Sequence, residues 1–309
     1  MTFSDNDYNI MEQVIAATAT EKPDFKSVMR DYFDLSKPGI GFYSLITTFT
    51  AFWLASSGKI DFILLLHTII ATGLVTAGGG ALNQVIEIDV DSEMHRTEKR
   101  PLPTGRVSAN SGLAFGVITS IAGTLYLLLA VNALTALLAI VTLAGYLFVY
   151  TPSKKITSLS TIIGAFPGAI PILIGWVAVT GSIDIRGWTL FAILFLWQIP
   201  HFLAIAWMYR KDYARAGFPM LTVIEPEGIS AAHQSVIYLI ALVPISLFPT
   251  QLGLTGNIYF IGALVLGLGF LASGVMVAIR RTNTSARQML FASIIYLPVL
   301  LVLMIVDKI

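Results

Sequence analysis

The chain has 309 residues, of which 56% are hydrophobic and 12% are charged, and its mean hydropathy is +0.79. A soluble domain carries about 25% charged residues, so this composition excludes an ordinary soluble enzyme and indicates an integral membrane protein. The absence of cysteine excludes disulfides, thiolate metal sites and a cysteine nucleophile. The net charge of +1 identifies no partner by itself, and we do not expect nucleic acid to be one.

A polar stretch of mixed charge, residues 1–37, opens the chain. It lacks the basic start, apolar stretch and small-residue cleavage site of a signal peptide, and its several acids argue against a transit peptide. We expect a cytosolic N-terminal tail in which "SVMRDYFDL" forms a short interfacial helix. A disordered tail is the alternative for residues 1 to about 24. Residues 38–309 are then one transmembrane domain.

Nine segments are apolar and long enough to cross a bilayer as helices, which takes about 20 residues. They are 39–57, 62–86, 109–129, 132–150, 159–180, 187–208, 229–249, 256–279 and 286–306. The third and fourth are joined by only "VN", which predicts an antiparallel hairpin. Strands are not needed, because a helix satisfies its own backbone in lipid. The expected fold class is therefore all-α, a polytopic membrane protein with nine transmembrane helices.

The basic residues are distributed unevenly between the two sides of these spans. Of the 19 Lys and Arg residues, only Lys59, Arg186 and Lys308 fall on one side, and all the others lie in the N-terminal tail and the even-to-odd loops. The positive-inside rule therefore places the N-terminus in the cytoplasm and the C-terminus outside. The membrane that we expect is a bacterial inner membrane.

Asn83, Glu87 and Asp91 recur every four residues at the cytoplasmic end of the second span. At about 100° per residue they drift only about 40° per step and share one helix face, whereas Asp89 falls off that face. Carboxylate and amide oxygens are hard ligands, and Mg²⁺ suits such a site when positions stay open for substrate phosphates. Basic side chains that suit phosphate oxygens follow directly: Arg96, Lys99 and Arg100.

The alternative for this cluster is a solvated helix end whose acids and bases pair with one another. Asn83 favours a functional site, because it lies one to two turns inside the apolar segment, where polar groups are functional candidates.

A second polar cluster follows the sixth span, in "WQIPHFLAIAWMYRKDYARAGFPML", at the same membrane face. Asp212 could supply a second metal ligand or orient a basic side chain, with a local helix-end ion pair as the alternative. His201 lies about 13 Å deeper than Arg210. For His201, a position lining a site and a hydrogen-bonded core position both stay open.

The fifth span contains "GAFPGAIPILIGW", with three glycines and two prolines. We expect a kinked or broken helix that either lines a cavity or packs closely.

Several of these motifs, taken in order, resemble the UbiA-type intramembrane prenyltransferases. "NQVIEIDVDSEMHRTEKRPLPTG" resembles their first Asp-rich motif, and in detail it is similar to the branch that farnesylates haem. "DYFDLSKPGI", "YTPSKK", "PGAIPILIGW", "WQIPHF" and "DYARAGFPML" also resemble that branch, so the likeness runs from about residue 31 to 221. The last three spans match only in hydropathy. Glu87 departs from the Asp of many members, but the longer carboxylate can still coordinate Mg²⁺.

The resemblance implies a UbiA-type helix bundle that joins farnesyl diphosphate to a vinyl group of haem B in the bilayer, in an active site that faces the cytoplasm. It implies Mg²⁺ held by Asn83, Glu87 and Asp91, with Asp212 as a further ligand or orienting group and His201 as a candidate for the haem site. Five basic residues are expected to hold the diphosphate: Arg96, Arg100, Lys155, Arg210 and Lys211.

The product, haem O, would supply terminal oxidases, with a haem A synthase as a downstream partner. Two alternatives stay open: a UbiA-type enzyme acting on an aromatic or quinone precursor, and a transporter gated by the charged loops. A transporter would place its polar groups nearer the midplane and often shows paired half-repeats.

Overall fold

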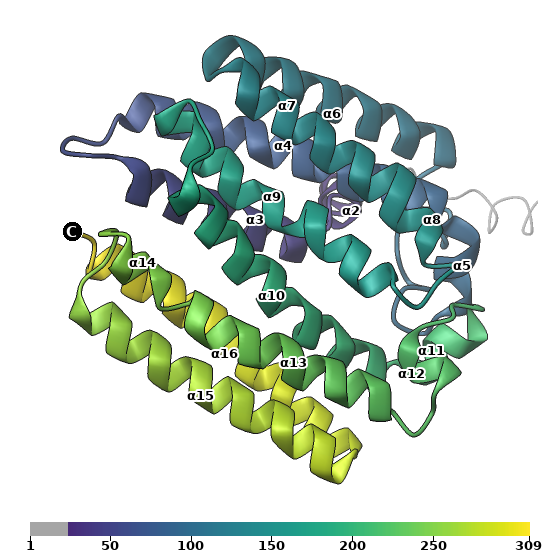
Figure 1. Ribbon diagram of the computed structural model, residues 1–309. Coiled ribbons are helices and arrows are strands. Elements are labelled where there is room, and N and C mark those ends of the chain that lie inside the picture. Colours follow the sequence, from purple (N-terminus) through teal and green to yellow (C-terminus); the bar gives the residue numbers. More distant parts are fainter. Residues whose placement is uncertain (1–23) are drawn as a thin grey trace, which may run out of the picture.

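Residues 24–309 are described by the computed structural model, and the predicted tail before residue 24 lies outside the described residues. In this part of the chain the long helices lie side by side in an elongated bundle (Figure 1). The described residues form no strand, and their single β-bridge joins Thr255 to Lys308. The all-α prediction is therefore confirmed.

The helices follow the predicted spans closely. Their bounds are α2 Phe25–Leu35, α3 Pro38–Ala55, α4 Phe62–Ile86, α5 Ile88–Glu93, α6 Ala109–Ala130, α7 Ala133–Ala144, the π-helix η1 Gly145–Tyr150, α8 Thr151–Ser153, α9 Ser160–Thr180, α10 Ile185–Met208, α11 Arg210–Arg215, α12 Leu221–Ile224, α13 Ile229–Ile245, α14 Phe248–Gln251, α15 Asn257–Arg280 and α16 Asn283–Val306.

Eight helical stretches among the described residues are long and apolar enough to cross a membrane. Helix α3 lies where the first span is predicted, but it is not one of these eight. The count of nine spans therefore stays a prediction, although each predicted span coincides with a helix.

Polar side chains at the helix starts explain several of these boundaries. Asp61 accepts hydrogen bonds from the backbone N–H groups of the first turn of α4, and Asp184 does the same for α10. Asn132 caps α7 by accepting from Thr135 N–H at 2.9 Å. Caps of this kind satisfy backbone donors that the helix itself leaves free. The two-residue connection before α7 makes α6 and α7 the predicted hairpin.

Helix α9 is the most enclosed of the eight apolar stretches and packs against α3, α7 and α10. The helix continues without a break through both prolines, so the broken helix that the sequence made possible does not form. Its approach to α3 is close: a Cβ placed on Gly175 would lie 2.0 Å from the carbonyl oxygen of Thr48. Only glycine permits backbones to come this near.

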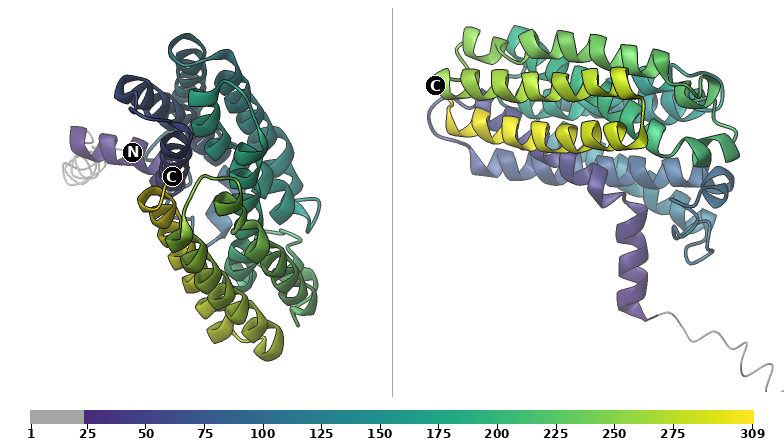
Figure 2. Two further views of the ribbon diagram at one scale, coloured as in Figure 1. Left: turned by 60° about the vertical axis from the view of Figure 1, so that its left-hand side comes forward. Right: turned by 90° about the horizontal axis from the view of Figure 1, so that it is seen from below.

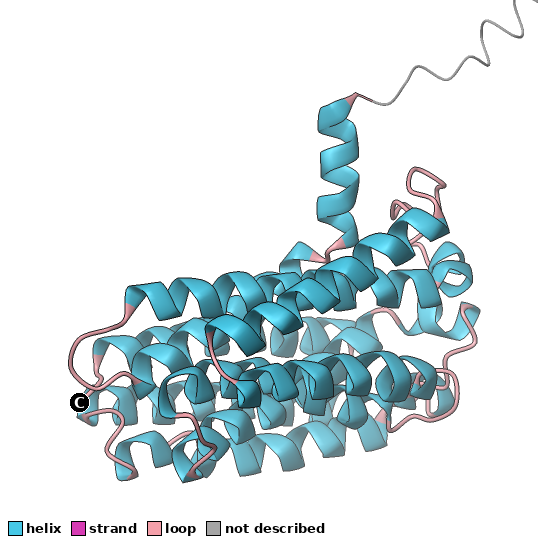
Figure 3. Cartoon of the chain, turned by 90° about the horizontal axis from the view of Figure 1, so that it is seen from above, coloured by secondary structure: helices cyan, strands magenta, loops and turns pink. Residues whose placement is uncertain are grey.

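The two ends of the bundle differ in their content. Helices α5, α8, α11 and α12 lie at one end, and α14 with the C-terminus lies at the other (Figure 1). Helix α2 stands out from the bundle, roughly perpendicular to the long helices (Figure 2). The longer loops gather at the ends of the bundle (Figure 3). Short elements and connections therefore converge at the end where the Asp-rich motif lies.

Candidate active site

The face formed by Asn83, Glu87 and Asp91 is present, although the helix that carries it is interrupted. Helix α4 ends and α5 begins on either side of Glu87. The four-residue register survives, because Glu87 N–H donates to Asn83 O at 3.0 Å and Asp91 N–H donates to Glu87 O at 2.7 Å. The exposed fractions are 0% for Asn83, 5% for Glu87 and 1% for Asp91, whereas Asp89 is exposed. The predicted inward face and its solvated neighbour are thus confirmed.

Each member of this face is held by a cation from another part of the chain. The Nζ atom of Lys154 lies 2.8 Å from Oε1 of Glu87, and Nη1 of Arg100 lies 2.5 Å from Oδ2 of Asp91. The amide oxygen of Asn83 accepts a hydrogen bond from Nζ of Lys37. Buried charges need such partners, because leaving one unpaired in a poorly solvated site is costly.

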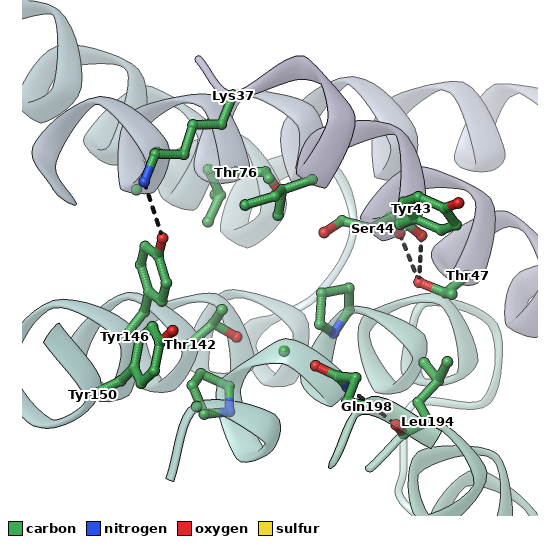
Figure 4. Close-up of a pocket in the computed structure, with 18 of the residues that line it drawn as sticks. Lys37, Tyr43, Ser44, Thr47, Thr76, Thr142, Tyr146, Tyr150, Leu194 and Gln198 are labelled. Carbon is green, nitrogen blue, oxygen red and sulfur yellow. Dashed lines mark hydrogen bonds between the residues drawn. The ribbon is translucent and has the colours of Figure 1, made fainter. Parts of the chain in front are cut away.

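Lys37 lies between α2 and α3 in the left-handed backbone region, with φ 53°. A non-glycine residue is uncommon there, and such positions occur often at functional sites. Its ammonium group points toward Tyr146, whose hydroxyl lies 3.5 Å away (Figure 4). Burial, together with the charges of Arg100 and Lys154, lowers the pKa of Lys37 to about 7. The backbone thus directs a basic side chain into the site from the start of the first span.

The π-helical end of the fourth span brings a further set of polar groups to Asn83. The carbonyl of Tyr146 accepts from the backbone N–H of Thr151 and, at 2.8 Å, from its hydroxyl. The Nδ2 atom of Asn83 donates to that hydroxyl oxygen at 2.8 Å. Just beyond, Nζ of Lys154 lies 4.6 Å from the centroid of the Tyr150 ring. A π-helix often marks a functional site, and here it aligns four side chains with the Asp-rich motif.

The charge state of Lys154 follows from these neighbours. Burial alone would lower the pKa of its ammonium group, but the nearby Tyr150 and the carboxylate of Glu87 outweigh that effect and raise it above its ordinary value. Lys154 is therefore a permanent cation in the site.

Two other predicted diphosphate contacts differ in their surroundings. The guanidinium of Arg96 lies over the rings of Tyr209 and Tyr213, at 5.4 and 6.0 Å from the centroids. The side chain of Lys155 is exposed and forms no hydrogen bond or ion pair with the described residues, whereas Lys154 beside it points into the site. The structure therefore brings the neighbour of Lys155, and not Lys155 itself, to the cluster.

The second cluster lies at the same end and contacts the loop after the Asp-rich face, where Arg215 lies 3.1 Å from Nε2 of His95, but Arg210, Lys211 and Asp212 make no hydrogen bond or ion pair with Asn83, Glu87 or Asp91. Asp212 pairs with Arg215 at 2.6 Å, so the helix-end ion pair is the arrangement present. Arg210 donates to the side-chain oxygen of Asn283 at 2.8 Å, and Lys211 is exposed. These three residues lie on the short helix α11 and are not among the side chains that contact Asn83, Glu87 and Asp91.

A cavity of about 270 Å³ opens beside the cluster, with Lys37 and Tyr146 in its wall (Figure 4). Helices α3, α4, α7, α9, α10 and α16 contribute the other walls, and most of the lining is apolar. The Gly- and Pro-rich segment of α9 lines it through Gly164, Pro167, Gly168 and Pro171, which confirms the cavity-lining alternative for that segment. A slot of this kind suits a long apolar substrate whose polar end reaches the cations.

His201 lines the same cavity, and its Nδ1 atom lies 2.7 Å from Oγ of Ser293. The two interpretations of this histidine are therefore compatible: it is hydrogen-bonded within the bundle and also faces the cavity.

Lys37, Lys154 and Tyr146 are the members of the site that the sequence did not identify. Lys37 and Lys154 lie in "SKPGI" and "YTPSKK", the basic segments at the predicted cytoplasmic ends of two spans. The sequence therefore indicated basic residues at the right end of these spans, but spacing along the chain could not show which lysine side chain points into the site.

The oxygen ligands fit Mg²⁺ when phosphate oxygens complete the set. Residues 24–309 contain no group of three His, Cys, Asp or Glu side chains that could hold a metal alone. The protein donors would be the amide oxygen of Asn83 and the carboxylates of Glu87 and Asp91. Arg100 contacts only one oxygen of Asp91, whereas Lys154 donates to both oxygens of Glu87 and Lys37 donates to the oxygen of Asn83, so the metal would share these two donors with the lysines or displace them. One or two carboxylates shared with substrate phosphates are typical of Mg²⁺ sites.

Comparison with known proteins places the chain in a family. The model of the UbiA prenyltransferase family matches residues 44–295. The chain is 52% identical over 289 residues to the protein named protoheme IX farnesyltransferase from Solibacter usitatus, covering 91% of this chain and 99% of that relative.

Solved structures share the fold. A structure of digeranylgeranylglyceryl phosphate synthase superposes with a TM-score of 0.77 at 19% identity, covering 90% of this chain and 98% of that one. A UbiA homologue from Archaeoglobus fulgidus, solved with DMAPP and Mg²⁺, superposes with a TM-score of 0.64 at 14% identity, covering 89% of this chain and 99% of that one. Because the family model matches residues 44–295, the chain belongs to the UbiA prenyltransferase family.

Proposed function

We propose that the protein transfers the farnesyl group of farnesyl diphosphate to a vinyl group of haem B and thereby makes haem O and diphosphate. One observation carries this proposal: the cation-paired face of Asn83, Glu87 and Asp91 lies beside an apolar cavity in a chain 52% identical to a protoheme IX farnesyltransferase.

The difficult step is breaking the allylic C–O bond, since negative charge then develops on the diphosphate. Lys37, Arg100 and Lys154 are held at the Asp-rich face before the substrate arrives, and we expect the developing charge to lie among them. Preorganised cations in a poorly solvated site stabilise developing charge far more than they would in water. When bound at Asn83, Glu87 and Asp91, Mg²⁺ supplies Lewis-acid stabilisation of the phosphate oxygens.

The other residues predicted to contact the diphosphate have different roles in this proposal. Arg96 is a diphosphate contact at the mouth of the site, while Lys154 takes the position expected of Lys155. Arg210, Lys211 and Asp212 lie on α11, where Arg210 is bonded to Asn283 and Asp212 to Arg215, so contact with the diphosphate would require these two side chains to exchange partners.

The cavity beside the cations accommodates the farnesyl tail, whose burial contributes about 0.8 kcal/mol per CH₂ group. Its apolar walls also keep bulk water away from the allylic cation until the vinyl carbon reacts. His201, in the wall of the same cavity, is the candidate residue of the haem site, on the side where the vinyl group would react.

The orientation follows from charge. Residues 38–309 form the transmembrane domain of a bacterial inner-membrane protein, with the N-terminus and active site facing the cytoplasm and the C-terminus outside. The excess of Lys and Arg at the active-site end supports this placement. Haem O leaves into the bilayer, where a haem A synthase could take it up.

The test is an assay of membranes that carry the protein, supplied with haem B, farnesyl diphosphate and Mg²⁺. We expect haem O to accumulate; its absence, under conditions in which the Solibacter relative makes it, would contradict the proposal. An aromatic or quinone precursor added in the same assay separates the second candidate, because a true substrate would be prenylated and would compete with haem.

A further inference from the structure

Helix α10 directs two hydrogen-bond acceptors into the cavity, and neither has a donor partner among the described residues. They are the carboxamide oxygen of Gln198 and Nε2 of His201, three residues apart and therefore on the same helix face. In a cavity lined mostly by apolar groups, two free acceptors on one face are unusual and call for a proton donor.

The hydrogen bonds of His201 determine which ring nitrogen is free. The hydroxyl of Ser293 has one proton and donates it to the carbonyl of Leu290 at 2.6 Å. With the proton in that bond, its oxygen accepts from His201, whose Nδ1 lies 2.7 Å away. The neutral imidazole consequently carries its proton on Nδ1 and leaves the lone pair on Nε2.

The ring is also held in its plane. Trp197 stacks on His201 with 4.9 Å between centroids and 20° between planes. The indole Nε1 of Trp197 donates to the carbonyl of Ser293 at 2.9 Å. The lone pair of Nε2 is thus fixed in direction by the same segment of α16 that fixes the tautomer.

The side chain of Gln198 is also held in one orientation. It is buried, with an exposed fraction of 5%, and its Nε2 donates to the carbonyl of Leu194 at 3.2 Å (Figure 4). This bond leaves the carboxamide oxygen as the free end of the side chain. A Cβ on Gly168 would lie 2.1 Å from that oxygen, so α9 provides the space for it by having glycine there.

We infer that Gln198 and His201 hold the water molecule whose oxygen becomes the hydroxyl group of the product; this inference rests on the proposed haem farnesylation. A water molecule that donates both protons, one to each acceptor, turns an oxygen lone pair toward the rest of the cavity. That is the arrangement needed to add water to a carbocation.

The reaction then runs from ionisation of the diphosphate to addition of water. The C–O bond of farnesyl diphosphate breaks, its electron pair leaves on diphosphate, and the terminal vinyl carbon of haem forms the new C–C bond. The inner vinyl carbon then carries the positive charge. The water oxygen bonds to that carbon, and one water proton passes to Nε2 of His201 and later to diphosphate or solvent. Ser293 stabilises the resulting imidazolium through Nδ1–H.

The experiment measures product composition by mass spectrometry. The wild type is compared with His201→Ala, Gln198→Leu and Gly168→Ala. Each protein receives haem B, farnesyl diphosphate and Mg²⁺ in water labelled with heavy oxygen. The wild type should place the label in the product hydroxyl. In the variants we expect hydroxylated product to form on the order of 100-fold more slowly, because a proton acceptor is lost or displaced. A farnesylated product lighter by one water should appear, since the cation then loses a proton from its neighbouring carbon.

His67→Ala and Gln251→Leu are the matched controls, because neither residue lines this cavity. If the wild type makes no haem O, the proposed function itself fails. If it does, and the three cavity variants give wild-type rates and only hydroxylated product, the inference is wrong while the function stands. A Soret band of bound haem that shifts in His201→Ala, with unchanged product composition, would instead assign His201 to the haem iron and would also overturn the inference.

Discussion

Individual side chains in this site are held in pairs that join distant parts of the chain. Asp91 is 1% exposed and is bound by Arg100, and Glu87 is 5% exposed and is bound by Lys154. A buried carboxylate and its cation are interdependent, because removing either leaves the other charge without compensation. In the proposed mechanism the same pairs supply the positive charge that binds the diphosphate, which would offset the cost of burying them.

Asp91→Asn removes one carboxylate while keeping nearly the same volume. We expect turnover to fall by at least about 100-fold, because electrostatic stabilisation of the leaving diphosphate is lost. The measurement is haem O formation by purified protein, with size-exclusion chromatography to show that the variant is folded. Asp89→Asn is the matched control on the exposed side of α5 and should retain wild-type activity. Wild-type turnover in Asp91→Asn would remove Asp91 from the metal site.

Two adjacent lysines give a second matched pair. Lys154→Met should lower kcat/KM for farnesyl diphosphate about 100-fold or more, because a fixed cation beside Glu87 is lost. Lys155→Met should change it little, because Lys155 is exposed. Steady-state kinetics with varied farnesyl diphosphate distinguishes them. Equal losses in the two variants, or a loss confined to Lys155→Met, would contradict the placement of Lys154.

At the scale of elements, hydropathy was sufficient to predict where the helices lie but not their internal irregularities. Each predicted span coincides with a helix, and the two-residue hairpin was predicted from "VN". The interruption at Glu87 and the π-helix Gly145–Tyr150 were not predicted. Both depend on which backbone hydrogen bond forms locally, and side-chain contacts between distant segments, such as Asn83 with Thr151, accompany that choice. A periodicity argument assumes a regular helix and cannot reveal either feature.

The crossing of α3 and α9 depends on one glycine. Gly175→Ala should destabilise the protein by about 1–3 kcal/mol, because the added Cβ would overlap the carbonyl of Thr48. Gly269→Ala on α15 is the control, since nothing lies within 4 Å of its Cβ position. Thermal unfolding in detergent compares them. A variant Gly175→Ala as stable as Gly269→Ala would show that the two helices can separate at no cost.

Helix α2 forms where the sequence predicts a short helix, and its interfacial position stays a prediction. Phe25, Met29 and Phe33 are exposed and recur every four residues, so they form one apolar stripe on a helix that stands across the bundle axis. Such a stripe on a charged helix suits the boundary between headgroups and acyl chains.

The absence of cysteine allows a direct test of this placement. A fluorophore on Met29→Cys should be quenched by a lipid-soluble quencher in nanodiscs, and one on Ser27→Cys, near the opposite face, by a water-soluble quencher. Equal quenching at both positions would contradict an interfacial position for α2.

For the whole molecule, the two ends of the bundle have separate roles. One end holds the paired charges of the site, and the other is tied together by the last residues, where Nζ of Lys308 donates to the carbonyl of Trp53 at 2.6 Å and Asp307 accepts from the N–H of Tyr259 at 2.7 Å. The charge bias in the sequence predicted this difference between the ends. It could not predict which cations turn inward, because Lys37 and Asn83 lie 46 residues apart and meet only after folding.

The central claim is that this bundle farnesylates haem through a cation- and metal-dependent ionisation of the allylic diphosphate. The most direct measurement is haem O formation by the purified full chain in nanodiscs, with haem B and farnesyl diphosphate, before and after a chelator removes divalent metal. We predict that haem O and diphosphate form in equal amounts with Mg²⁺, stop with the chelator and resume when Mg²⁺ is restored. Prenylation of a quinone precursor in preference to haem, or haem O formation that the chelator leaves unchanged, would contradict the account.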